Sequence, residues 1–116
     1  MPTSNRHRGA ASGRPNDPPL LILTSLADGP KHGYALLGDI EAFAGVRLGP
    51  GTLYGALSRL EQRGLIEGLA EHGRTRPYRL TDQGHAALVE ALEELRALVV
   101  VGTARISPAA TVAPAS

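Results

Sequence analysis

The segment from Gly49 to Leu80 constrains the fold of this chain more than any other part of the sequence. Residues 49–64 have the pattern of a helix, a short strand follows at residues 65–67, and an Arg-rich turn leads to a second short strand that ends at Leu80. Helix, strand, turn and strand in this order are typical of a winged helix. We therefore predict a mainly α fold, a winged helix-turn-helix with a two-stranded β wing.

The helix at residues 49–64 has one apolar and one polar side on a helical wheel. The apolar stripe, which we assign to the core, consists of Leu53, Ala56, Leu57 and Leu60. The opposite side is small and polar, with Gly51, Gly55, Ser58 and Gln62 flanked by Thr52, Tyr54 and Arg59. A helix that reads DNA needs this division, because it must be anchored to its own domain while its outer side enters a major groove about 12 Å wide.

Charge is distributed unevenly along the chain. The net charge of +1 does not by itself indicate a nucleic-acid partner, but Arg residues gather between Arg47 and Arg79, and the sequence after Thr81 leans acidic. Nearly all cations are Arg, which suits phosphate and guanine contacts, although a genome rich in G and C would also favour Arg over Lys. Both explanations stay open. Without cysteine, neither a disulfide framework nor a thiolate metal site can form.

The two ends of the chain lack apolar periodicity. We expect residues 1–16 to be a disordered basic tail, for which a solvated leader is favoured over an arm that touches DNA, and residues 107–116 to be a disordered tail. Between them lie a DNA-binding domain at 17–80 and a long helix at 81–106. No apolar run approaches the roughly 20 residues that span a bilayer, so we expect a soluble, cytoplasmic protein with no membrane partner.

Two helices are predicted before the winged segment. Asp17 followed by two prolines is typical of a helix start, and the first helix, from Leu20 to Ala27, is apolar enough to be buried on most sides. A second helix begins near His32. Its apolar residues at helical spacing are Tyr34, Leu37, Ile40 and either Phe43 or Ala44.

The last helix, capped by Thr81 and ending near Ile106, has apolar positions that alternate steps of three and four. They are His85, Leu88, Leu92, Leu95, Val99, Gly102 and Ile106. A 3.5-residue repeat of this kind usually faces another helix. We therefore predict a C-terminal dimerisation helix and a homodimer, with Leu88, Leu92, Leu95 and Val99 in the interface. The alternative is a helix that folds back onto its own domain.

A set of short motifs resembles the PadR family of transcriptional regulators. They are Lys31-His32-Gly33-Tyr34-Ala35-Leu36, Gly51-Thr52-Leu53-Tyr54, Leu57-Ser58-Arg59-Leu60-Glu61, Gly64-Leu65-Ile66, and Tyr78-Arg79-Leu80-Thr81 followed by Gly84. The resemblance implies a regulator, usually a repressor, that binds a double-stranded DNA operator as a dimer and is released by a stress signal or by a small-molecule effector at the dimer interface. The single last helix is similar to the compact branch of the family.

The chain departs from the family pattern at two points. Gly55 stands where relatives commonly have proline, and the last helix has no Trp, Tyr or Phe on which a flat aromatic drug could stack.

Nine residues are predicted to contact DNA. They are Lys31, His32, Tyr34, Thr52, Tyr54, Ser58, Arg59, Arg74 and Arg76. Hydroxyls at the start of the helix can meet phosphates, Arg59 can pair with guanine or phosphate, and two arginines lie in the wing turn. Other interpretations stay open: a helix-cap role for Thr52, a solvated Arg59, a local hydrogen bond for His32, and rings partly in the core for Tyr34 and Tyr54.

Other functional classes fit the sequence less well. The start at residues 49–52 lacks the Lys-Ser/Thr pair of a phosphate loop, and the four histidines are scattered without metal-ligand spacing. We therefore predict no catalytic residues, no metal and no cofactor. The competing interpretations are a winged helix that binds protein, and a regulator of another family such as MarR-like, which the lack of an extra N-terminal dimerisation helix disfavours.

Overall fold

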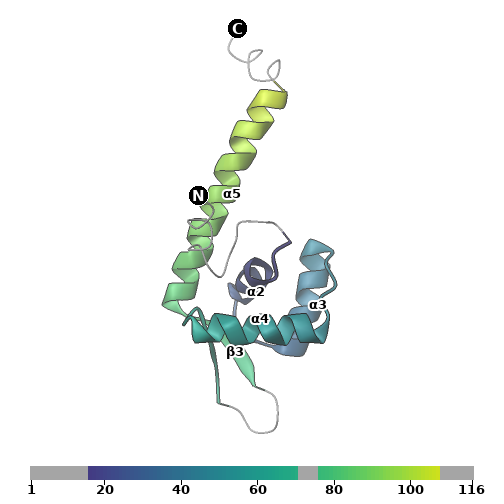
Figure 1. The fold of residues 1–116 in the computed structure, drawn as a ribbon, viewed down its shortest axis with the longest axis vertical. Helices are drawn as coiled ribbons and strands as arrows, with labels where there is room; N and C mark the ends of the chain where they lie inside the picture. The colour runs from purple at the N-terminus through teal and green to yellow at the C-terminus, as the bar shows by residue number, and fades with distance from the viewer. Residues whose placement is uncertain (1–15, 71–75, 108–116) are drawn as a thin grey trace.

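The computed structural model describes residues 16–70 and 76–107 as a mainly helical fold with a small antiparallel sheet, shown in Figure 1. The elements in chain order are α2 (Pro18–Leu26), β1 (Lys31–His32), α3 (Gly33–Ala44), α4 (Pro50–Gln62), β2 (Ile66–Gly68), β3 (Pro77–Leu80) and α5 (Asp82–Ile106). Helices α3 and α4 form the helix-turn-helix, and β2 with β3 forms the wing. The winged helix-turn-helix prediction is confirmed. The predicted tails lie outside the described residues, apart from residues 16 and 107.

Helix α2 is central to the domain, because it packs against α3, α4, α5 and β3. The Asp17 carboxylate caps it by accepting a hydrogen bond from the amide of Leu20 at 3.3 Å, and prolines fill its first turn, where no N–H is needed. Its buried apolar side chains are Leu20, Leu21, Ile22, Leu23 and Leu26. The prediction of a first helix buried on most sides is confirmed.

The sheet has one strand more than the sequence predicted. Strands β2 and β3 pair antiparallel, and β1 pairs with the other edge of β3, with Lys31 opposite Tyr78 and His32 opposite Pro77. The sequence analysis placed Lys31 and His32 only on the approach to the second helix. Two residues are too few to show the alternation of a strand, and their partner strand lies far along the chain.

A hydrogen-bonded joint connects the end of α4, the wing and the start of α5. Gly64 follows α4 in the left-handed region, at φ 78°, and the amide of Leu65 donates to the carbonyl of Leu60 at 3.0 Å, which closes a Schellman motif. The Thr81 hydroxyl donates to the carbonyl of Gly64 at 2.7 Å and accepts from the amide of Gly84 at 3.0 Å. One side chain therefore caps α5 and holds the end of α4.

Helix α5 packs on the domain only along its first half. Leu88 and Ala91 are buried in the common core, and Leu95 packs against that core. Beyond them the helix projects away from the domain (Figure 1), so the alternative in which all of it folds back is not observed. Within residues 16–70 and 76–107, no helix is both long and apolar enough to cross a membrane.

Candidate nucleic-acid interface

Helix α4 has the two sides that its sequence predicts. Gly49 is its N-cap and Pro50 opens its first turn. Leu53, Ala56, Leu57 and Leu60 are all buried, which confirms the predicted core stripe. The outer side exposes Gly51, Thr52, Tyr54, Ser58, Arg59 and Gln62, with Gly55 half-buried among them. This side of α4 has no exposed aliphatic side chain, so its backbone can come close to a ligand that approaches from outside.

The ring of Tyr54 links α4 to the start of α3. Its side chain is 48% exposed, and a Cβ placed on Gly33 would stand 2.4 Å from the Tyr54 hydroxyl oxygen. A Cβ at Gly33, the first residue of α3, would therefore displace the Tyr54 ring. The Tyr54 ring is exposed along part of its surface, and its hydroxyl lies at the amino end of α3.

Tyr34 differs from its prediction. The sequence analysis placed its ring on an apolar stripe of the second helix, but the side chain is 87% exposed, and Phe43 is exposed as well. The buried positions of α3 are Gly33, Leu36 and Ile40. The pattern was misassigned because two overlapping helical stripes fit this helix, and the tyrosine ring counted as apolar. Tyr34 lies entirely on the surface at the amino end of α3.

The arginines near α4 divide into two groups. Arg47, Arg76 and Arg79 each form an ion pair with a glutamate. In the part of the chain that the structure describes, Arg59 and Arg63 have no carboxylate partner and are exposed. They are four residues apart, hence on one side of the carboxyl end of α4. Arg63 was not among the predicted contacts, although this spacing from Arg59 could have identified it.

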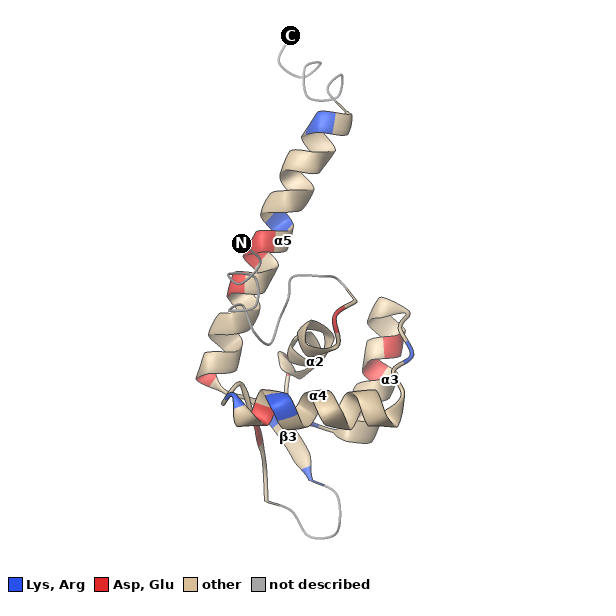
Figure 2. Ribbon diagram, in the orientation of Figure 1, with Lys and Arg blue, Asp and Glu red and all other residues tan. Residues whose placement is uncertain are grey.

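The two arginines of the wing turn, Arg74 and Arg76, were predicted to contact DNA. Arg74 lies outside the described residues. Arg76 does have another partner: its guanidinium donates to Glu61 of α4 at 3.1 Å and lies 5.4 Å from the ring centroid of Tyr78. Arg76 therefore has a partner within the domain that is distant in sequence, and its contact with DNA stays a prediction. Figure 2 shows acidic and basic segments next to each other where α4 meets the wing.

Lys31 is also engaged within the domain. Its ammonium group donates to the carbonyl of Ser25 in the last turn of α2 and to the carboxylate of Asp28, and its side chain is only 18% exposed. A cation at the carboxyl end of a helix satisfies carbonyls that have no intrahelical partner. Its ammonium beside Asp28 lowers the pKa of that carboxyl group. The prediction of Lys31 as a DNA contact is not supported by this geometry. The next predicted contact, His32, is half-buried and is the N-cap residue of α3.

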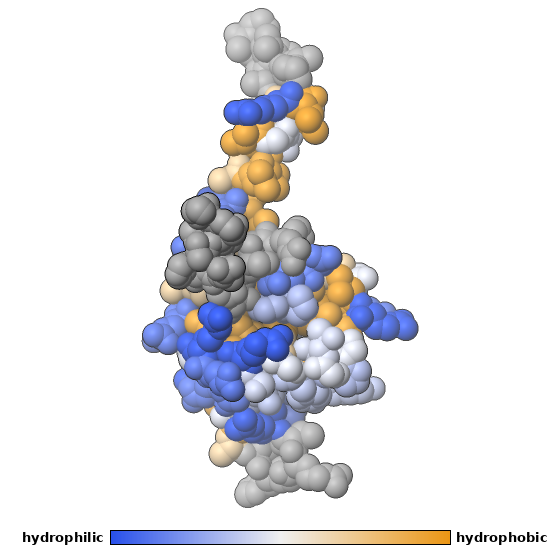
Figure 3. Space-filling view, viewed as in Figure 1, coloured by the Kyte–Doolittle hydropathy of each residue, from blue (hydrophilic) through white to orange (hydrophobic). Residues whose placement is uncertain are grey.

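The predicted dimerisation residues divide between the core and the surface. Leu88 is only 4% exposed and belongs to the core of its own domain, and Leu95 is partly buried against it. Leu92 is 45% exposed and Val99 62% exposed. The remaining large exposed apolar residues near the end of α5 are Leu98, Val100, Val101 and Ile106. Figure 3 shows this projecting part of the helix as a largely hydrophobic surface.

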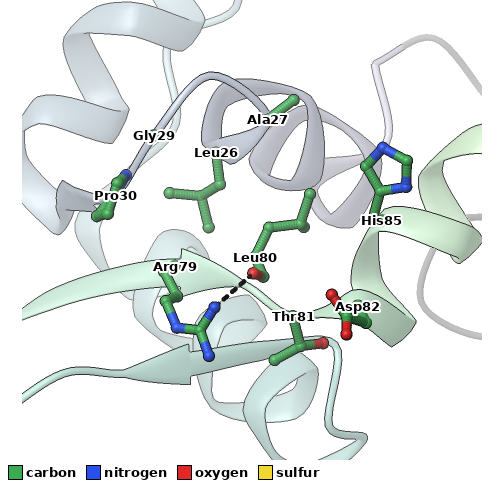
Figure 4. A pocket seen from close by; sticks show the side chains of 9 residues that line it. All are labelled: Leu26, Ala27, Gly29, Pro30, Arg79, Leu80, Thr81, Asp82 and His85. Carbon is green, nitrogen blue, oxygen red and sulfur yellow. Dashed lines mark hydrogen bonds between the residues drawn. The ribbon is translucent and has the colours of Figure 1, made fainter.

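A pocket of about 290 Å³ lies where the end of α2, strand β3 and the start of α5 meet (Figure 4). Leu26 and Leu80 supply apolar walls, while Arg79, Asp82 and His85 supply polar groups. The pocket is at the base of the wing and not at the exposed end of α5, so it is distinct from the position predicted for an effector.

The helix-turn-helix, the adjoining wing and the exposed polar side of α4 together define a winged helix-turn-helix protein. Residues 22–90 match the model of the transcriptional regulator PadR-like family. The chain belongs to this family of transcriptional regulators.

Individual relatives agree with this assignment. The transcriptional regulator Rv3488 of Mycobacterium tuberculosis is 45% identical over 89 residues, which cover 72% of this chain and 82% of that protein. An uncharacterised 37.1 kDa protein of a Streptomyces fradiae transposon is 55% identical over 75 residues, 65% of this chain, and the chain spans only 22% of its length. The crystal structure of a PadR family transcription regulator from Clostridium difficile has a TM-score of 0.66 at 27% identity, covering 75% of this chain and 95% of that one.

Proposed function

We propose that this regulator binds double-stranded DNA through the outer side of α4. The observation that carries the proposal is that this side is small and polar, and ends in two exposed arginines, Arg59 and Arg63, that pair with no carboxylate among the described residues. The exposed residues of the same helix-turn-helix that carry a hydroxyl donor for phosphate oxygens are Thr52, Ser58, Tyr34 and Tyr54. Arg59 can also donate to guanine in the major groove.

The salt dependence of binding tests this interface. Removing one phosphate contact should reduce the slope of log affinity against log salt by about 0.9. The double substitution Arg59→Ala and Arg63→Ala should lower the slope, measured by fluorescence anisotropy with random-sequence duplex DNA. Arg96→Ala is the matched control, because Arg96 pairs with Glu93 on α5, away from α4. Equal slopes for the double variant and the control would refute the interface.

We propose further that the protein acts as a homodimer joined by α5. In support, a single chain exposes Leu92, Val99 and the apolar residues that follow them to water. This exposure is unfavourable in free energy, and packing against a second copy would bury the same surface. Analytical ultracentrifugation should show a dimer for the parent and for Ala97→Glu, which changes the opposite side of the helix, and a monomer for Val99→Glu. A monomeric parent protein at micromolar concentration would contradict the dimer.

A two-fold dimer would present two copies of α4 to half-sites about one turn of DNA apart, so we propose an operator that is an inverted repeat. Regulation as a repressor in the cytoplasm, with release by a stress signal or a small-molecule effector at the dimer interface, rests on the family likeness. Footprinting on genomic fragments selected by the protein would test the operator; protection of one asymmetric site would count against it.

The competing use of the winged helix as a protein-binding module requires no exposed arginines on α4. A gel shift with random and genomic duplexes separates the two functions, because a protein-binding module would not slow the migration of either kind of duplex.

A further inference from the structure

The Glu61 side chain connects the wing to α4 at two points. Its carboxylate accepts from the amide of Gly68 in β2 at 3.1 Å and from the guanidinium of Arg76, just before β3, at 3.1 and 3.3 Å. One carboxylate on the helix therefore holds both strands of the wing.

The surroundings of this contact fit it closely. The Arg76 guanidinium crosses β2 at Gly68, where a Cβ would stand 2.4 Å from the guanidinium carbon, and its other neighbour is the ring of Tyr78. Gly68 thus gives the arginine room to reach Glu61. The second ion pair of the sheet, between Arg79 and Glu67, joins β3 to β2 only and makes no connection to α4.

We propose that Glu61 is a positioning residue for DNA binding: it fixes the angle of the wing against α4, so that both reach the duplex together. This proposal rests on the proposed DNA-binding function. A carboxylate beside a DNA-binding surface would otherwise be unfavourable, since it repels phosphate. If Glu61 positions the wing, removing its carboxylate should weaken DNA binding. If the carboxylate only repels phosphate, removing it should strengthen DNA binding.

Glu61→Ala and Glu67→Ala form a matched pair for the test. Each removes one carboxylate and one ion pair with an arginine in or next to β3, so the net charge of the winged domain changes by one unit in both variants. With random-sequence duplex DNA in fluorescence anisotropy, Glu67→Ala should bind at least as tightly as the parent. Glu61→Ala should bind roughly threefold to tenfold more weakly, equivalent to about one phosphate contact fewer. Tighter binding by both variants would overturn the proposal.

Glu61→Asp supplies a second variant that keeps the charge but shortens the side chain by one methylene. It should also weaken binding, whereas Glu67→Asp should not; parent-like affinity for Glu61→Asp would overturn the proposal. Circular dichroism of each variant confirms that the fold is retained.

Amide hydrogen exchange tests the connection without DNA. In the free protein the Gly68 amide should exchange faster in Glu61→Ala and at the parent rate in Glu67→Ala, because only the first variant removes its acceptor. Unchanged exchange at Gly68 would overturn the positioning role. A parent protein that fails to bind duplex DNA, together with faster exchange at Gly68 in Glu61→Ala, would instead refute the proposed function and leave the connection between Glu61 and the wing intact.

Discussion

Replacing Gly84 by alanine should destabilise the domain, although alanine is the better helix former. A Cβ at this position would stand 1.9 Å from the carbonyl oxygen of Leu65 and 2.9 Å from the Leu80 side chain. The carbonyl would have to move by about 1 Å to reach the 3.0 Å below which such contacts essentially never occur. It cannot move freely, because it accepts the amide of Thr81 at 3.1 Å.

The size of the effect follows from three terms. Overpacking of this kind costs about 1–3 kcal/mol. The strained hydrogen bond from Thr81 adds about 1 kcal/mol, and the helix preference for alanine returns up to about 1 kcal/mol. We expect Gly84→Ala to lower the free energy of unfolding by roughly 1–3 kcal/mol.

Gly38→Ala is the matched control, because Gly38 lies inside α3 and nothing stands within 4 Å of its built Cβ. That variant should be stabilised by about 0.5–1 kcal/mol. Urea unfolding, followed by circular dichroism at one protein concentration, compares the two variants. Their midpoints report stability when the dependence of the unfolding free energy on urea concentration, m, is the same for both. If Gly84→Ala proves as stable as Gly38→Ala, the close approach of α5 to Leu65 is not rigid and the reasoning fails.

Three other substitutions test the packing and the pH dependence of the domain. Leu57→Ala should cost about 2–5 kcal/mol in urea unfolding and abolish DNA binding only by unfolding; a folded but inactive variant would contradict its core assignment. Gly33→Ala should lower the thermal midpoint in the parent but much less with Tyr54→Ala, and equal decreases in both backgrounds would argue against their contact. Asp28→Asn should be less stable than the parent at neutral pH. Because Lys31 lowers the pKa of Asp28 below its usual 3.8, the parent loses this advantage as the pH falls through the lowered value, and a difference that persists in stronger acid would contradict the pair.

Periodic patterns within one element were predicted well from the sequence. The stripe of Leu53, Ala56, Leu57 and Leu60 is buried because a helical repeat over several turns leaves only one apolar side. Gly64, where the helical pattern of residues 49–64 ends, lies in the left-handed region that only glycine enters at low cost. These features depend on neighbouring residues alone.

Features that depend on distant residues were missed. The partners of Arg76 and Lys31, and the pairing of β1 with β3, are set by contacts between segments that the sequence does not show to be adjacent. Leu88 fits the same 3.5-residue repeat as Val99, yet one is in the core and the other exposed. A repeat identifies the side of a helix that is covered, but not which neighbour covers it.

The Thr81 hydroxyl caps α5 and also donates to the carbonyl of Gly64, which follows α4. These two hydrogen bonds couple the movement of α5 to that of α4. The 25 residues of α5 form a rod about 37 Å long, and its base is tied directly to the carboxyl end of α4. Turning the rod by about 5° would sweep its far end through about 3 Å while the winged domain followed as one body. In the proposed dimer, a small change in how two such rods cross would therefore alter the spacing of the attached domains without any rearrangement inside them.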